Sequence, residues 1–214
     1  MKSSELKRLL RRNGCFLVRQ GTSHEIWESP ITNERFSVPR HDSQEIRTGT
    51  LENIKKQAGI KSLPILEFRF RMTENFFKKH TMYKITAIIE KGPDGRYAIT
   101  SPQSFGRNHF GGFGYTIEEA KADFRECVED CRELAIADGD GAPEEYQVSF
   151  RYDMPSFFED FDFINASRFA QFAGINESKM RQYKSGVAFP GEKTTRKILD
   201  AIHRIGSELS SVSL

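Results

Sequence analysis

The chain has 214 residues, of which 37% are hydrophobic and 29% are charged, and its formal net charge at pH 7 is +2. This length suits one large domain or two to three small ones. No apolar run approaches the roughly 20 residues that span a bilayer, and the charged N-terminal stretch MKSSELKRLLRRNG lacks the features of a secretory signal. Three cysteines form no disulfide framework, so we expect a cytoplasmic protein without membrane contact.

Charge is distributed in blocks along the chain. Residues 1–60 contain 11 Lys and Arg against 7 Asp and Glu, whereas residues 117–145 contain 11 acids against 3 bases. Residues 178–204 are basic again. The order suggests two surfaces for nucleic acid separated by one that repels it, although ordinary solvated faces also produce such blocks.

The sequence pattern of residues 1–60 predicts the element order α-β-β-β-α. The apolar spacing and turn residues indicate a helix capped by Ser3 or Ser4 and ending at Asn13-Gly14, strands over 15–19, 24–28 and 35–39, and a helix from about Thr50. Residues 61–81, which mix aromatic and basic side chains, are interpreted as a linker.

Residues 82–153 predict an α/β module. Strands over 84–90 and 96–101 flank the turn GPDG, and a last strand covers 146–152. Thr116 and Glu119 form a capping box that opens a long helix to about Ala137. The preceding run GGFG (111–114) is interpreted as a turn that feeds this helix rather than a phosphate loop, because no Lys-Ser/Thr pair follows it.

Residues 154–214 predict an all-α domain. Helices over 166–173 and 177–184, joined by the turn Gly174-Ile175-Asn176, have helix-turn-helix spacing, and a longer helix runs from 192 to about 209. Arg and Gln side chains fit the base edges of the major groove. The predicted DNA-binding residues are Ser178, Lys179, Arg181 and Gln182; a purely structural helical hairpin is the alternative.

The stretch Gly21-Thr22-Ser23-His24 carries the strongest candidate for catalysis. A lone histidine on a strand is usually structural, but imidazole titrates near neutrality and can move the protons of RNA cleavage without a metal or cofactor. His24 is therefore the candidate catalytic residue. The predicted RNA-binding residues are Gly21, Thr22, Ser23, Arg11, Arg12, Arg19 and Arg40.

Residues 2–60 resemble a known family through SELKRLLRRNGCFLVRQGTSHEIWES, SVPRH and EIRTGTLENIKKQAGI. They are similar to the HicA toxins, small mRNA interferases with a fold like the double-stranded-RNA-binding domain. The resemblance implies metal-independent RNA cleavage, with His24 essential in a motif of glycine, small hydroxyl residue, spacer and histidine. Many members carry a second histidine directly afterwards, where this sequence has Glu25.

The rest of the chain resembles the partner antitoxin, HicB. YKITAIIEKGPDGRYAITSP and GYTIEEAKADFRECVEDC are similar to its partial ribonuclease-H-like domain, and NASRFAQFAGINESKMRQYKSG is similar to its helix-turn-helix. The resemblance implies a non-catalytic domain whose acidic helix, 117–136, has the charge to face a basic toxin. Toxin and antitoxin are usually separate chains, so this sequence joins two proteins whose effective concentration for each other is high.

These observations lead to one hypothesis and one alternative. We expect an α+β chain with a toxin domain (1–60), a linker (61–81), an antitoxin domain (82–153) and a DNA-binding domain (154–214). It would be a latent mRNA interferase, neutralised within or between chains, that binds its own operator DNA as a homodimer or higher even-numbered oligomer. Toxin release would then require proteolysis, for example in 61–81. The alternative is a transcriptional regulator whose N-terminal module binds RNA or protein without cutting.

Overall fold

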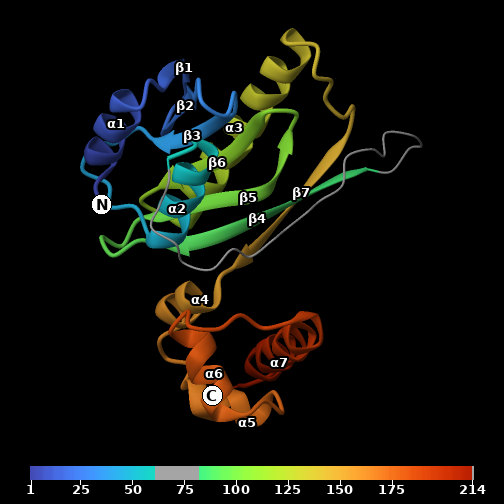
Figure 1. Ribbon diagram of the computed structural model, residues 1–214. Helices are drawn as coiled ribbons and strands as arrows, with labels where there is room; N and C mark the ends of the chain where they lie inside the picture. Colours follow the sequence, from blue (N-terminus) through green and yellow to red (C-terminus); the bar gives the residue numbers. More distant parts are fainter. Residues whose placement is uncertain (61–81, 214) are drawn as a thin grey trace. The chain divides into compact units, whose positions relative to one another are not determined.

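The computed structural model describes residues 1–60 and 82–213, which form a mixed α+β fold (Figure 1). Contacts divide the chain into two compact units, Met1–Arg151 and Tyr152–Leu214. The linker predicted over 61–81 lies outside the described residues. Within the described parts of the chain, no helix combines the length and the apolar character needed to cross a membrane.

The N-terminal segment, residues 1–60, has the predicted element order. Its elements are α1 (Ser3–Arg12), β1 (Phe16–Gln20), β2 (His24–Glu28), β3 (Arg35–Pro39) and α2 (Thr48–Gln57). The three strands are antiparallel neighbours. One face of this sheet is sealed by a small apolar core that includes Leu6, Leu10, Trp27, Phe36 and Ile54.

The predicted cap of the first helix was wrong. The N-cap of α1 is Lys2, whose backbone N–H donates to the Glu5 carboxylate at 2.9 Å. Ser3 lies inside the helix and is fully buried, and its hydroxyl donates to the carbonyl of Pro39 at 2.6 Å. Ser3 is therefore the first residue of α1 rather than its cap, and its hydroxyl links the helix to the end of β3.

The middle segment, residues 82–151, contributes four strands and one long helix. They are β4 (Tyr83–Lys91), β5 (Tyr97–Phe105), β6 (Asn108–Gly114), α3 (Ile117–Ala137) and β7 (Tyr146–Tyr152), whose last residue falls in the second unit. The capping box of Thr116 and Glu119 at the start of α3 is confirmed. The interpretation of residues 111–114 as a turn was wrong, because these residues form the second half of strand β6.

Both segments belong to one seven-stranded sheet with the order β1-β2-β3-β6-β5-β4-β7. The junction is the parallel pairing of β3 with β6, where Arg35 is in register with Asn108 and its N–H donates to the carbonyl of Arg107 at 2.7 Å. The Ser37 hydroxyl adds a bond to the carbonyl of Gly111 at 3.2 Å. The strands of the N-terminal segment therefore continue the sheet of the middle segment.

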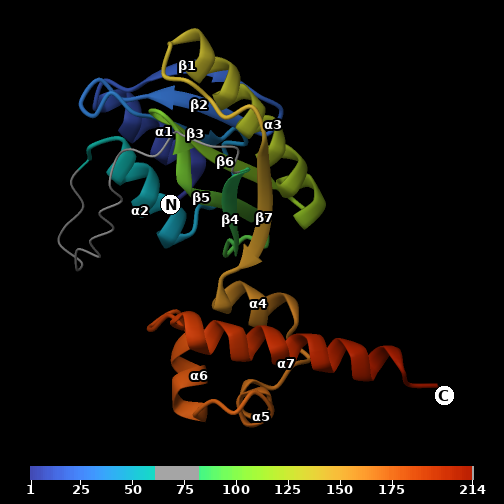
Figure 2. The same ribbon diagram turned by 90° about the vertical axis from the view of Figure 1, so that its right-hand side faces the viewer.

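Helix α3 packs on the face of this sheet opposite to α1 and α2 (Figure 2). Two glycines of β6 let its backbone come close: a Cβ at Gly112 would lie 2.4 Å from the backbone nitrogen of Phe124, and one at Gly114 would lie 2.4 Å from that of Ala120. No other residue type leaves this space free. The glycine run thus allows α3 to pack close to the sheet. At this short distance the side chains of α3 contact residues of β2.

The second unit is helical. Its helices are α4 (Met154–Asp160), α5 (Ala166–Phe172), α6 (Glu177–Lys184) and α7 (Glu192–Ser210). Gly174, with φ of +63°, turns the chain between α5 and α6, and the Asn176 side chain caps α6 by accepting from the Lys179 N–H. The core is lined by Phe157, Phe158, Phe169, Met180, Tyr183 and Ile198.

Candidate active site at the His24 loop

The turn between β1 and β2, residues 20–24, positions the candidate histidine; we call it the His24 loop. The N–H of Gly21 donates to the carbonyl of His24 at 2.9 Å and closes the turn. A Cβ at Gly21 would lie 2.3 Å from Cε1 of the His24 ring. The ring therefore lies directly against the glycine, and a side chain at this position would displace it.

His24 is fully buried beneath α3. Its Nδ1 lies 2.9 Å from Oδ1 of Asp123, within hydrogen-bond distance. Its Nε2 lies 3.4 Å from Oδ2 of Asp130, which is close enough for an ion pair, but it makes no hydrogen bond to the described residues. Both carboxylates come from the middle segment, about 100 residues along the chain.

The surroundings of His24 keep its ring charged. Burial alone would lower the pKa of His24, but the negative charge of Cys127 and the hydrogen bond with Asp123 outweigh it and raise the pKa to about 11. Burial would likewise raise the pKa of the Cys127 thiol, yet its contacts with Cys131 and with the His24 charge lower it to about 5. A protonated ring cannot accept a proton, so His24 cannot act as a base in this arrangement.

The donors of the His24 loop are taken by the same helix. Thr22 donates from its backbone nitrogen and its hydroxyl to Oε1 of Glu126, at 3.2 and 3.0 Å. The Ser23 N–H donates to Oδ1 of Asp123 at 2.9 Å. Carboxylate oxygens thus occupy the positions that phosphate oxygens of a bound nucleic acid would take at such donors.

The predicted RNA-binding arginines divide into two groups. Arg19 pairs with Asp130 at 3.0 Å and with Glu133 at 2.8 Å, and Arg40 donates to the carbonyls of Gly21 and Thr22, both at 3.3 Å. Arg11 and Arg12 are exposed on α1, on the opposite face of the sheet from α3. The structure therefore brings Arg19 and Arg40, but not Arg11 and Arg12, to the loop.

Sequence reasoning did not single out the acids that contact the loop. Asp123, Glu126 and Asp130 contact the loop, and Glu133 contacts the neighbouring Arg19; we call these four acids the acidic face of α3. Their spacing of three or four residues places them on one side of a helix, which is a signal visible in the sequence. The sequence does not say which histidine or arginine that side would meet.

The two cysteines of α3 are structural neighbours of the site. Cys127 and Cys131 are both fully buried, and the sulfur of Cys127 accepts from the Gly111 N–H at 3.5 Å. No group of three or more potential ligands that could hold a metal ion occurs within residues 1–60 and 82–213.

The predicted DNA-binding residues lie on α6 of the second unit. Ser178, Lys179 and Arg181 are exposed, whereas Gln182 is half-buried. Arg181 lies 3.8 Å from Glu177, one helical turn earlier, in a pair that is itself solvent-exposed. These side chains are thus accessible on one short helix.

Comparison with known proteins assigns the N-terminal segment. No curated protein and no solved structure matches the chain significantly. Residues 3–60 match the family described as "HicA toxin of bacterial toxin-antitoxin", and the match covers α1 to α2 and includes the His24 loop. Residues 3–60 of this chain are therefore similar to the HicA toxins of bacterial toxin–antitoxin systems.

Proposed function

We propose that this chain is a latent mRNA interferase in which residues 82–151 act as the antitoxin for residues 1–60. The observation that carries the proposal is the engagement of the His24 loop by the acidic face of α3. HicA toxins are ribonucleases. In this chain, carboxylates contact the His24 ring and accept hydrogen bonds from the loop N–H groups that would otherwise bind an RNA phosphate.

The unmasked loop has the groups that metal-independent RNA cleavage requires. His24 would take the proton of the attacking 2'-hydroxyl or return one to the leaving 5'-oxygen. The N–H groups of Thr22 and Ser23 would stabilise the charge that develops on the phosphate, as oxyanion donors do. Arg19, once free of Asp130 and Glu133, would neutralise the RNA backbone.

Three features of the masked loop oppose this reaction. The ring is buried, so a 2'-hydroxyl cannot reach it. The raised pKa keeps the ring protonated, so it cannot take the proton of a 2'-hydroxyl, and Glu126 and Asp123 present negative charge where the substrate is also negative. Bringing a phosphate to within 4 Å of a carboxylate costs about 1 kcal/mol in water and several times more in a partly buried site.

The test compares growth and RNA integrity in cells that express residues 1–62, the same fragment with His24→Ala, and the full chain. We expect only the unmodified fragment to stop growth and degrade mRNA. A folded fragment that is harmless would instead favour the alternative, a regulator whose N-terminal module binds without cutting.

A second function, operator binding by α6, is supported by the exposed Ser178, Lys179 and Arg181 on a helix capped by Asn176. We expect the full chain to bind its upstream DNA as an even-numbered oligomer. Lys179→Ala with Arg181→Ala should weaken binding and reduce the salt dependence, with a slope change of about 1 for each phosphate that is no longer neutralised. Binding that is unchanged in this variant, or a monomer by light scattering at micromolar concentration, would contradict the proposal.

A further inference from the structure

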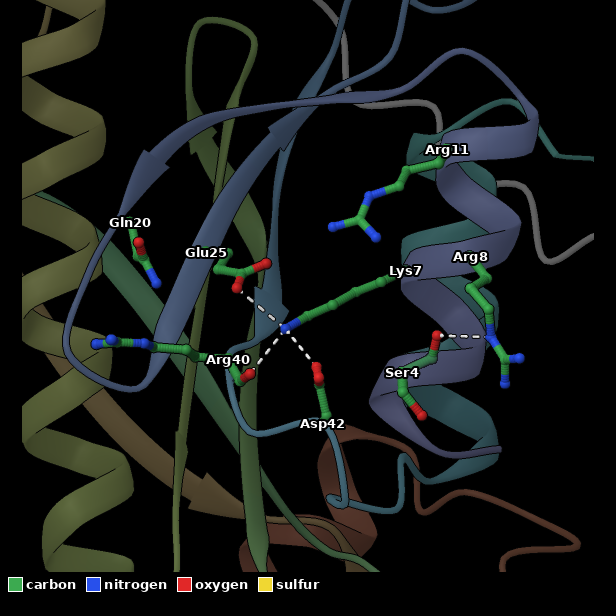
Figure 3. Close-up of a pocket in the computed structure, with 8 residues that line it drawn as sticks. All are labelled: Ser4, Lys7, Arg8, Arg11, Gln20, Glu25, Arg40 and Asp42. Atoms are coloured by element: carbon green, nitrogen blue, oxygen red, sulfur yellow. Dashed lines mark hydrogen bonds and ion pairs between the residues drawn. The ribbon is translucent and has the colours of Figure 1, made fainter.

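A polar pocket opens on the other side of the sheet from His24 (Figure 3). It has a volume of about 410 Å³, within the size range of small-molecule sites. Every residue that lines it lies between Ser4 and Asp42, so α3 takes no part in it. Successive side chains of a strand point to opposite faces, and Glu25 accordingly faces this pocket while His24 faces α3.

One buried lysine bonds to both acidic groups of the pocket. Nζ of Lys7 lies 3.0 Å from Glu25 and 3.1 Å from Asp42, and it donates to the carbonyl of Arg40 at 2.7 Å. An ammonium group has three protons, so these bonds use all of them. The other oxygen of Glu25 accepts from Nε1 of Trp27 at 2.9 Å. The acids are therefore committed to structural bonds.

The three arginines at the pocket have no acidic partner within the described residues. Arg8 makes only a long bond of 3.4 Å to the carbonyl of Ser4, and Arg11 lies over the ring of Trp27, 5.4 Å from its centroid. Arg40 donates only to carbonyl oxygens. By contrast, Arg19 on the masked side is paired with two acids of α3.

The contrast between the pocket arginines, which lack an acidic partner among the described residues, and the paired Arg19 indicates a ligand that carries phosphate groups. Guanidinium groups bind phosphate oxygens in pairs of parallel hydrogen bonds, and those that lack a carboxylate partner are available to do so. Arg40 joins the pocket to the masked loop, because its side chain reaches the carbonyls of Gly21 and Thr22. A nucleic-acid strand held at Arg8 and Arg11 would be led along Arg40 to the His24 loop.

We propose that this pocket is a phosphate-backbone site for single-stranded RNA that remains open while the His24 loop is covered. The intact chain then binds RNA without cutting it. The choice of RNA as the ligand rests on the proposed function, but the site and its arginines do not depend on cleavage.

The test measures binding of a fluorescently labelled 12-nucleotide RNA to the full chain between 50 and 200 mM salt. Lys179→Ala and Arg181→Ala are present in all samples, so that α6 does not contribute. Arg8→Glu with Arg11→Glu should weaken binding by at least about tenfold and lower the salt slope by about 1.4, since each phosphate of single-stranded RNA that is neutralised contributes about 0.7. The matched control is Lys56→Glu with Lys84→Glu, which reverses two exposed charges outside the pocket.

Each outcome decides the proposal. Equal affinity of the double variant and the control, or no RNA binding by the intact chain, overturns it. Arg8→Gln with Arg11→Gln should give a smaller loss with an unchanged melting temperature, which excludes misfolding as the cause. If inorganic phosphate binds at the pocket but RNA does not, the pocket is a site for small anions. This result would overturn the RNA assignment. Arginine-dependent RNA binding together with a harmless 1–62 fragment would leave this inference standing while the proposed nuclease fails.

Discussion

The carboxylate of Asp123 serves three partners at once: Nδ1 of His24, the Ser23 N–H and, through its second oxygen, the Phe113 N–H at 2.7 Å. It is almost fully buried, with 4% exposure. One side chain thus ties the His24 loop to β6 and supplies a negative charge to the histidine.

We expect Asp123→Asn to activate the full chain as a ribonuclease. The amide keeps the shape but removes the charge and offers only one accepting oxygen to three partners. The pKa of His24 should fall, and the free energy of unfolding should decrease by about 1–3 kcal/mol. RNA cleavage by the purified full chain measures the first effect, and urea unfolding measures the second. Glu118→Gln, an exposed position on the first turn of α3, is the control; equal activity in both variants would contradict the role of Asp123.

The pH dependence of stability tests the charges of His24 and Cys127. The pKa of His24 is raised from 6.5 to about 11, so its contribution is complete below pH 6.5 and is lost as the pH rises toward 11. The pKa of Cys127 is lowered from 9.0 to about 5, so its contribution is complete above pH 9 and is lost as the pH falls toward 5. Between pH 6.5 and 9 the two slopes oppose each other, and we expect a plateau in the free energy of unfolding.

The comparison with Cys127→Ser isolates this effect. Serine does not ionise, so the opposing contribution of Cys127 is lost. The pKa of His24 also falls, because a negative charge that raises it is removed, and the part of the rise that Asp123 supports should make stability decline from about pH 6.5 upward, over a narrower range. The urea midpoint of both proteins, measured from pH 5 to 10, gives the difference. Parallel curves would show that the thiol carries no charge beside the ring.

The sequence singled out one side of the contact between the His24 loop and α3 but not the other. Gly21, Thr22, Ser23 and His24 were predicted as site residues because a short motif contains them, and Arg19 because it is close along the chain; their function stays a prediction. Asp123 and Glu126 were not predicted, because a contact across 100 residues depends on where α3 crosses the sheet. That position is set by packing, which periodicity does not encode.

At the scale of elements, glycines 112 and 114 determine how α3 meets the sheet. Gly112→Ala would place a methyl group 2.4 Å from the backbone nitrogen of Phe124, so the helix must move. We expect a loss of about 1–3 kcal/mol, as for other overpacked sites, together with measurable ribonuclease activity, since the acidic face moves away from the His24 loop. The assays are urea unfolding and RNA cleavage by the full chain.

Gly95→Ala supplies the matched control. Gly95 has φ of +79°, so alanine is strained there, but a methyl group would meet nothing within 4 Å. This variant should lose stability without releasing the loop. Ribonuclease activity in both variants would show that general destabilisation, rather than displacement of α3, exposes His24.

Local signals predicted most elements within a few residues, and the exceptions have physical causes. The N-terminal order, α3 with its capping box, β7 and α6 follow from apolar spacing and caps. Strand β6 was missed because glycine disfavours strands in isolation, and here it is retained to admit a helix. Ser3 was expected as a cap because its hydroxyl suits that role, but tertiary contact with Pro39 uses the hydroxyl instead.

At the scale of the whole molecule, the sequence predicts separate domains over residues 1–60 and 82–153. The contacts instead place residues 1–151 in one compact unit. The pairing of β3 with β6 makes their strands one sheet. Arg35 reinforces the junction, with Nε 2.7 Å from Glu28 on β2 and its Nη1 paired with Asp138 beyond α3. Strand pairing of this kind is invisible in local patterns, because either edge of a sheet can accept a neighbour.

This union leads to a prediction about release of the toxin. If the two segments are held by the shared sheet and by the acidic face of α3, cutting the chain between residues 61 and 81 should not activate it. A protease site inserted there and cleaved in the purified protein should leave two fragments that co-elute in gel filtration, with RNA cleavage still absent. The covalent join raises the effective concentration of the partners, but the buried His24 contacts and the β3–β6 pairing hold them once formed.

Activity should appear only when the second fragment is removed, for example by separation in urea and refolding of the first fragment alone. Refolding the two fragments together is the control and should restore inhibition. Fragments that separate on cleavage, or RNA cleavage as soon as the chain is cut, would show instead that the join itself maintains the mask. Under our prediction a cell would have to degrade residues 82–151, not merely cut the chain, to free the ribonuclease.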